Sequence, residues 1–338
     1  MATYLLSAAL AMLVQSSEAE GQPLIDFTKE RLAFRQSVTA LFEGGRVDAL
    51  EEQARELRVK RPRFSSGTPV LFDFYEAFNP GSEHIPETAK GPYADRVLLW
   101  AESKPRSLVA TMAAIKVAKY RAWKARGRGS ANTVTDEGWQ EFRRQELKAW
   151  SLAQAAEQLG TVDPALYKEM LDLCKDLERP RSDLDTILGK LVAIDPAFDQ
   201  AYIMVANYLL PRWHGSAREL HDFALRATEQ SRPAMGSATY ARIAIVVALV
   251  ERSKIVTAYP FEYKRIKEAF QDLDGRYPNS GRTINFYAWF ALVYGDLATA
   301  RPLLDRIAQE WTTDGDEVWG GRAKFDHYRA AASGPTTR

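Results

Sequence analysis

One stretch of this sequence is rich in cations and contains no acid. Between residues 103 and 135 there is no Asp or Glu. The cations of this basic stretch, residues 104–128, are Lys104, Arg106, Lys116, Lys119, Arg121, Lys124, Arg126 and Arg128. On a helix, Arg121, Lys124 and Arg128 share one face, with Tyr120 and Trp123 beside it. A basic face edged by aromatic rings is typical of a surface that binds an anion, a nucleic acid or an acidic partner.

A second interpretation gives the same cations no ligand. Lys and Arg near a helix C-terminus are favoured by the helix dipole, and they can pair with acids elsewhere in the fold. The acids considered as partners are Asp172, Asp176, Glu178, Asp183 and Asp185. The whole chain has 45 Lys and Arg against 44 Asp and Glu, a net charge of +1. A balance this close creates no overall field that attracts nucleic acid or an anionic membrane, so both interpretations stay open.

Arg and Trp stand together in the segment Tyr-Leu-Leu-Pro-Arg-Trp-His-Gly-Ser, residues 208–216, which is longer than a tight turn between helices needs. Both residue types are over-represented among binding hot spots, so Arg212 and Trp213 are candidate contacts for a protein partner. In the alternative, Trp213 folds back as a buried wedge and Arg212 pairs with a carboxylate. We expect a structural role for Trp213 and a shared role for Arg212.

The residue types that usually carry catalysis form no recognisable motif. The four histidines are His84, His214, His221 and His327, and none has the spacing of a metal site. The single cysteine, Cys174, sits in an apolar run typical of a small buried hydrophobe. No glycine-rich phosphate loop is present, so we expect no metal, no cofactor and no catalysis. A hydrolase remains the alternative, because carboxylate pairs of that kind meet only in three dimensions.

The elements that must position these residues are all helices. Apolar periodicity predicts helices over residues 24–42, from Val47, over 70–78, and from 136 to about Gly160, with a proline-rich irregular loop over 79–92 between the third and a short helix closed by Trp100. Ser107 is expected to cap a helix that stops at Gly127, and Ser182 to cap another. Ser216 and Glu219 form a capping-box pattern ahead of a further helix.

A proline-marked pair of helices recurs in the C-terminal half. Asp163-Pro164, Asp195-Pro196 and Tyr277-Pro278 each precede a helical pattern. At the same offsets from the second and third prolines stand small or apolar residues: Tyr202, Val205, Ala206 and Leu209, then Ile284, Tyr287, Ala288 and Ala291. Repeated helical pairs bury their apolar faces against each other, an architecture common in binding proteins. The repeat predicts an all-α solenoid of tetratricopeptide-like helical hairpins.

The ends of the chain are interpreted separately. An apolar run over residues 5–14, with Ser17 and Ala19 at the positions that signal peptidases read, predicts a signal peptide over 1–19 and a periplasmic or secreted protein; otherwise the protein is cytoplasmic. Residues 20–332 are expected to be a single helical domain, with an N-terminal part over 20–133 and a repeat-like part over 134–332. Residues 333–338 are expected to be a disordered tail.

Several segments resemble an uncharacterised bacterial family, domain of unknown function 4034. They are Gly45-Arg46-Val47-Asp48-Ala49-Leu50, Trp123-Lys124-Ala125-Arg126-Gly127, Glu137-Gly138-Trp139, residues 208–216 and Tyr240-Ala241-Arg242. The resemblance implies a helical fold related to tetratricopeptide repeats and supplies no activity. His214 departs from the family, which more often has glycine there. The resemblance makes one set of residues worth testing together for partner binding: Trp123, Arg126, Arg212, Trp213, Tyr240 and Arg242.

These observations favour a non-catalytic module that binds a protein or peptide. A carboxylate-based hydrolase and an anion or nucleic-acid binder acting through residues 104–128 are the two alternatives. We expect no stable membrane span in the mature chain.

Overall fold

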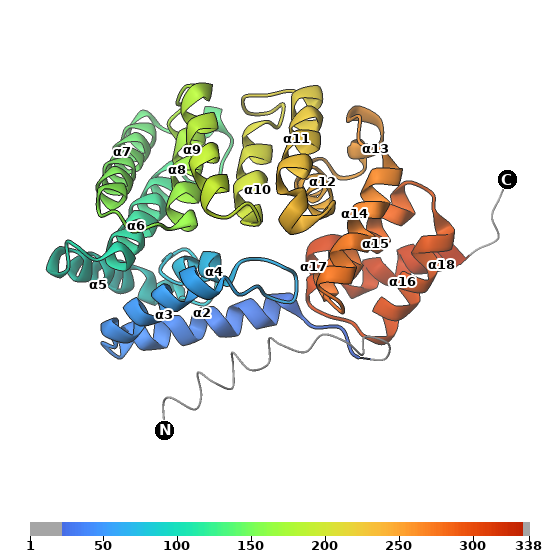
Figure 1. The fold of residues 1–338 in the computed structure, drawn as a ribbon, viewed down its shortest axis with the longest axis horizontal. Coiled ribbons are helices and arrows are strands. Elements are labelled where there is room, and N and C mark those ends of the chain that lie inside the picture. Colours follow the sequence, from blue (N-terminus) through green and yellow to red (C-terminus); the bar gives the residue numbers. More distant parts are fainter. Residues whose placement is uncertain (1–21, 334–338) are drawn as a thin grey trace. The chain divides into compact units, whose positions relative to one another are not determined.

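The computed structural model describes residues 22–333 (Figure 1). Every regular element in that range is a helix, which confirms the all-α fold. Within the same range, β pairing is limited to isolated bridges, one of which joins Ile25 and Ser280. The expected signal peptide and residues 334–338 of the expected tail lie outside the described residues. No helix in the described range is both long enough and apolar enough to cross a membrane.

The helices belong to two compact units. Among the described residues, unit 1 contains 22–31, Pro62–Thr68 and 206–333, and unit 2 contains Leu32–Arg61 and Pro69–Val205. The division falls within α2 (Phe27–Glu43) and α10 (Asp199–Tyr208), and not at the boundary we expected between residues 133 and 134. The two helices on either side of that expected boundary, α6 and α7, pack against each other inside unit 2.

Unit 2 is built around α6. Its elements are α3 (Val47–Lys60), α4 (Val70–Glu76), η1 (Glu87–Ala89), α5 (Lys90–Ser103), α6 (Leu108–Arg126), η2 (Ala131–Thr133), α7 (Asp136–Gln158), α8 (Pro164–Asp176) and α9 (Arg181–Ile194). Helix α6 packs against α3, α4, α5 and α7, while α8 packs against α4, α7 and α9.

The sequence of α6 explains its central position. Every residue from Leu108 to Lys119 is buried, and most of them are Ala, Val, Met, Ile or Leu. A helix that is apolar on all sides is stable only when other elements cover all of it. Ser107 caps the helix as expected, since its hydroxyl accepts a hydrogen bond from the Ala110 N–H at 2.9 Å. Gly127, at φ 75°, ends it.

Unit 1 consists of helices that pack mainly on their neighbours in sequence. They are α11 (Ala217–Met235), α12 (Ala238–Glu251), η3 (Arg252–Lys254), α13 (Ile255–Ala258), α14 (Tyr263–Arg276), α15 (Gly281–Val293), α16 (Leu297–Gln309), α17 (Asp314–Trp319) and α18 (Arg322–Ser333). Contacts run from α11 to α12, then through α14 and α15 to α16, and α17 and α18 close the C-terminal end.

The proline repeat is present, with one member out of register. Pro196 and Pro278 each stand three residues ahead of a helix, α10 and α15. The apolar residues predicted at equal offsets in these two helices are all buried. Pro164 instead occupies the first turn of α8, where the lack of an N–H costs no helical hydrogen bond. Asp163 caps that helix.

Two local expectations were wrong. The loop expected over residues 79–92 ends earlier, because η1 and then α5 begin at Glu87 and Lys90. Pro92 lies in the first turn of α5, where backbone N–H groups have no acceptor within the helix, so the N–H that proline lacks is not needed. Helix α9 begins at Arg181 with no side-chain cap, so Ser182 lies inside its first turn.

The first described residues of unit 1 are held by acids from near the C-terminus. The Asp314 carboxylate accepts hydrogen bonds from the backbone N–H groups of Phe27 and Thr28, each at 3.0 Å, and from the Thr28 hydroxyl at 2.8 Å. In return, Asp26 accepts from the Thr313 N–H at 2.9 Å and from its hydroxyl. Each aspartate thus satisfies donors at the start of the other's helix.

The substitution Asp314→Ala tests this exchange. It would leave the buried Phe27 N–H and the half-buried Thr28 N–H without acceptors, so we expect a loss of about 2 to 4 kcal/mol in the free energy of unfolding. Asp305→Ala is the matched control, because Asp305 pairs only with the partly exposed Arg329, and we expect it to cost less than about 1 kcal/mol. Equal losses in the two variants, measured by chemical denaturation, would show that the exchange does not stabilise unit 1.

Candidate functional site

The residues proposed for joint testing are divided between the units. Trp123 and Arg126 lie at the C-terminal end of α6 in unit 2. In unit 1, Arg212 and Trp213 lie in the turn that follows α10, and Tyr240 and Arg242 lie on α12. Neither unit contains the whole set.

Tyr240 and Arg242 are interior residues, each 2% exposed. The Tyr240 hydroxyl accepts a hydrogen bond from the Glu262 N–H at 3.3 Å and contacts His221 Nε2 at 3.1 Å. The Arg242 guanidinium donates to the Ser66 carbonyl. Gly67 adjoins that contact at φ 81°, and a Cβ there would stand 2.6 Å from Arg242 Nη2. Arg242 therefore holds the loop of residues 62–68 in place and is not available to a partner.

Trp213 is 41% exposed, so the buried-wedge expectation was wrong. The interior side of this turn is filled by Leu209 and Leu210, both fully buried. His214 stacks on the Tyr208 ring, with ring centres 4.6 Å apart. Its backbone does not have positive φ, so the turn does not require the glycine common in the resembling family. The Arg212 guanidinium lies 5.6 Å from the centre of the Trp213 ring.

A second group of Trp and Arg side chains lies in unit 2, and we name it the Trp–Arg face: Trp123, Arg126, Trp139 and Phe142. The Arg126 guanidinium lies 5.4 Å from the ring centre of Trp123 and 5.3 Å from that of Trp139. Both indoles contact Phe142 edge to face, at 5.4 and 5.7 Å. Trp123 and Trp139 remain 36% and 37% exposed. Arg126 is thus sandwiched between two exposed indoles above a buried phenyl ring.

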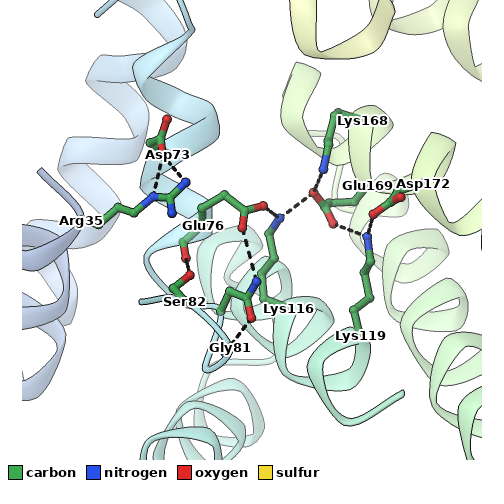
Figure 2. Close-up of polar contacts among 11 residues, drawn as sticks. Arg35, Asp73, Glu76, Gly81, Ser82, Lys116, Lys119, Lys168, Glu169 and Asp172 are labelled. Atoms are coloured by element: carbon green, nitrogen blue, oxygen red, sulfur yellow. Dashed lines mark hydrogen bonds and ion pairs between the residues drawn. The ribbon is translucent and has the colours of Figure 1, made fainter. Parts of the chain in front are cut away.

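Two cations of the basic stretch point into unit 2 and not to solvent. Lys116 and Lys119 are buried on α6, and Figure 2 shows both reaching carboxylates of other helices. Lys116 pairs with Glu76 of α4 and, at 2.6 Å, with Glu169 of α8. Lys119 pairs with Glu169 at 3.1 Å and with Asp172. Both lysines are therefore ion-paired. Asp172 was among the acids considered as partners, whereas Glu76 and Glu169 were not.

Glu169 is the centre of this group. Its Oε1 accepts hydrogen bonds from Lys116 and, at 3.0 Å, from Lys168 of its own helix, and its Oε2 accepts from Lys119 (Figure 2). We name the set Glu76, Lys116, Lys119, Lys168, Glu169 and Asp172 the lysine cluster. It holds three ammonium groups and three carboxylates, so it is neutral as a whole when all are ionised.

The charges of the cluster act on one another through little solvent. Burial by itself would raise the pKa of Glu76, but the ammonium groups of Lys116 and Lys168 outweigh burial and lower that pKa to about 2. Lys116, Lys119 and Lys168 likewise hold the pKa of Glu169 well below its usual range despite burial. Both carboxylates therefore stay ionised at neutral pH.

A pocket of about 320 Å³ opens beside the lysine cluster. The cluster supplies Glu76, Lys116, Lys119, Lys168 and Asp172 to its lining, and the remaining lining residues are Asn79, Gly81, Tyr120 and Trp123. Asn79 belongs to the turn after α4, where its amide donates to Glu76 at 3.4 Å and its carbonyl oxygen accepts from the Gly81 N–H at 2.9 Å. Ammonium groups, carboxylates and two aromatic rings therefore face one space. We name it the lysine pocket.

Glu146 of α7 is buried beside this group without a hydrogen-bond partner for either carboxylate oxygen. Burial raises its pKa to about 8, and the Lys119 ammonium opposes that shift only in part. Glu146 is therefore mostly protonated at neutral pH.

Glu146 and Glu169 are buried carboxylates with pKa values shifted in opposite directions, a feature typical of the acid and base pair of a hydrolase. Both oxygens of Glu169 are held by lysines, however, and Glu146 does not line the lysine pocket. This arrangement leaves no ionised carboxylate of the pair free to act as base or nucleophile. Across residues 22–333, no group of three or more His, Cys, Asp and Glu side chains is placed to hold a metal ion.

Lys168, Glu76 and Glu169 were not predicted from the sequence as site residues. A detectable signal existed for one of them, because Lys116 and Lys119 are spaced three apart on α6, and Glu169 and Asp172 are spaced three apart on α8. Two helices with matched spacing can pair both lysines with both acids. Glu76 and Lys168 carry no such signal.

Comparison of the chain with protein-family models, with curated proteins and with solved structures gave no match. The resemblance to the family of unknown function stays a prediction.

The protonation of Glu146 makes stability depend on pH. Its folded-state pKa, about 8, lies above the ordinary value of 4.5. The proton therefore stabilises the fold fully below pH 4.5, and this contribution is lost as the pH rises through 8. We expect Glu146→Gln, which mimics the protonated acid, to gain up to about 4 kcal/mol over the wild type at pH 8.5 and little at pH 4.5.

Glu141→Gln is the control for this test, because Glu141 lies on the same helix but is paired with Arg144 at the surface. Thermal unfolding of both variants and the wild type across this pH range measures the effect. A Glu146→Gln advantage that does not grow with pH would show that Glu146 is ionised in the folded protein.

Proposed function

We propose that this chain is a non-catalytic binding module whose Trp–Arg face recognises an acidic segment of another protein. The observation that supports the proposal most directly is the exposure of Trp123 and Trp139 on either side of Arg126. Large aromatic rings and Arg are the residues that dominate binding hot spots. If no partner covers them, two indoles that are each more than a third exposed lower the solubility of the protein.

The Trp–Arg face is held in its binding geometry before any partner arrives. The Trp123 indole N–H donates to Asp176 at 3.3 Å, and the Arg126 guanidinium donates to the carbonyls of Gly127 and Gly129 at 3.2 and 2.9 Å. Phe142 supports both indoles from beneath. A surface that is ordered in advance loses less side-chain entropy when a partner binds.

The charges near the face favour an acidic partner over a nucleic acid. Lys124 and Arg128 are exposed beside Trp123 and Arg126, whereas Lys116 and Lys119 are buried in ion pairs inside the lysine cluster. Arg121 is paired with Asp95 at 2.8 Å. What remains is a small cationic patch around aromatic rings, which suits a few carboxylates better than a continuous phosphate backbone.

We further propose that the helix pairs α8–α9, α11–α12 and α15–α16 are repeats of the tetratricopeptide-like kind. Each pair consists of consecutive helices that pack on each other, and the second half of the chain carries the proline-marked repeat. Modules built from such pairs commonly present a surface for peptide recognition.

The test begins with selection of peptides from a random-sequence library on the immobilised full chain. We expect the selected peptides to be rich in Asp and Glu. Calorimetry should then show that Trp139→Ala and Arg126→Ala each weaken a selected peptide by about 2 kcal/mol or more. Arg126→Lys should also impair binding, because an ammonium group cannot reproduce planar stacking between two indoles.

Trp213→Ala is the matched control, since Trp213 is an equally exposed indole beside an Arg but lies in unit 1. It should leave the affinity unchanged. Loss of binding in Trp213→Ala alone would move the binding surface to unit 1 and refute the proposal. So would binding of a single-stranded oligonucleotide more tightly than any selected peptide at the same salt concentration. Thermal midpoints of all variants show whether a loss reflects unfolding.

A further inference from the structure

The lysines of the lysine cluster are not equivalent. Lys116 and Lys119 each pair with two carboxylates from helices other than their own. Within residues 22–333, Lys168 pairs only with Glu169, the next residue on its own helix, through an oxygen that Lys116 also uses. An ammonium group has three N–H donors. Lys168 is thus the least satisfied of the three.

The surroundings of Lys168 also differ. Its Nζ lies 5.0 Å from the centre of the Phe72 ring, and its side chain lines the lysine pocket while being almost completely buried. Burial, with help from the positive charges of Lys116 and Lys119, lowers the pKa of Lys168 to about 8, although Glu169 opposes the shift. Glu169 and Glu76 instead raise the pKa of Lys116 against the effect of burial. One pocket therefore contains a persistent cation and an amine that is partly neutral at physiological pH.

We propose that Lys168 is a reactive amine that forms an imine with a small carbonyl compound bearing an anionic group, bound in the lysine pocket. The pocket volume of about 320 Å³ fits a compact metabolite and not a peptide segment. The remaining N–H donors of Lys116 and Lys119 bind the anionic group, and the rings of Tyr120 and Trp123 contact the body of the ligand. This site goes beyond the binding function proposed for the Trp–Arg face and does not rest on it.

The chemistry needs no redox partner. The neutral Nζ of Lys168 attacks the carbonyl carbon and forms a C–N bond, while the carbonyl oxygen takes up a proton to give a carbinolamine. That hydroxyl group leaves as water after a second protonation, and the amine loses its own protons to produce the C=N bond. The net reaction joins an amine and an aldehyde or ketone and releases one water molecule. A lysine whose amine is desolvated beside other cations is suited to this step.

The probe is pyridoxal 5′-phosphate, which carries an aldehyde and a phosphate, compared with pyridoxal, which lacks the phosphate. The full chain is incubated with each at pH 7.5, the imine is reduced with borohydride, and the modified lysines are located by peptide mass spectrometry. We expect Lys168 to be modified at least tenfold faster than the exposed Lys124, and only by the phosphorylated aldehyde. Inorganic phosphate should compete for modification of Lys168 and not of Lys124.

The pH dependence provides a second readout. The charged groups that face Lys168 are Glu76 from α4, Lys116 and Lys119 from α6, and Glu169 from its own helix. Glu76, Lys116 and Glu169 should keep their charges between pH 6.5 and 8.5. Glu146 of the neighbouring helix α7 has a pKa of about 8, so the rate is also measured in Glu146→Gln, and in both proteins it should rise with a midpoint near 8. A midpoint above 10 would show that Lys168 behaves as an ordinary surface amine.

Lys168→Arg and Lys124→Arg are the matched variants, because each keeps its positive charge and removes its primary amine. The first should abolish the fast modification and the second should not. Mapping in the wild type needs no variant, so the proposal remains testable if Lys168→Arg does not fold. Equal labelling of Lys168 and Lys124, or equal labelling by pyridoxal and its phosphate, would overturn the proposal.

Discussion

The Glu169 carboxylate binds three ammonium groups, and the arrangement of unit 2 around its pocket depends on that one set of ion pairs. Lys116 and Lys119 come from α6, the central helix of the unit, and Lys168 comes from α8. Removing one partner of a buried ion pair costs about 3 to 5 kcal/mol, because the other charge stays buried without compensation. Loss of Glu169 would leave Lys168 without a carboxylate partner, while Lys116 would keep Glu76 and Lys119 would keep Asp172. The Glu169 carboxylate thereby fixes α8 against α6 and is the shared partner of all three lysines.

Helix α6 performs two different tasks along its length. Its first part is apolar on all sides and is covered completely, so the two lysines within it must find partners inside the protein. Its last turn reaches the surface, where Trp123 and Arg126 form one side of the Trp–Arg face. Because a helix is rigid over this distance, burial of the first part determines where the exposed part lies. The interior ion pairs and the exposed rings are consequences of one helix placement.

The helices and most of their ends could be predicted from the sequence because the signals are local. Ser107, Asp163, Ser216 and Asp296 each cap a helix through hydrogen bonds to residues two or three positions away. Acids that act over long sequence separations could not be predicted this way. Asp314 satisfies donors of Phe27, 287 residues earlier, and nothing near either residue indicates the other. The same limit applies to Lys168, whose environment is made by α4 and α6 as well as by its own helix.

Two features of unit 2 reduce the stability of the fold at neutral pH. Glu146 is buried without a hydrogen bond, and Lys168 is buried with a single carboxylate that it shares. Either could be replaced by an apolar residue with little loss of packing, and replacements of that kind often stabilise proteins. Groups that a fold keeps at the expense of its own stability are concentrated at functional sites. Lys168 faces the pocket and Glu146 does not. A functional reason for keeping a destabilising group therefore applies first to Lys168. Glu146 is protonated beside Lys119, so it leaves the charge balance of the lysine cluster unchanged.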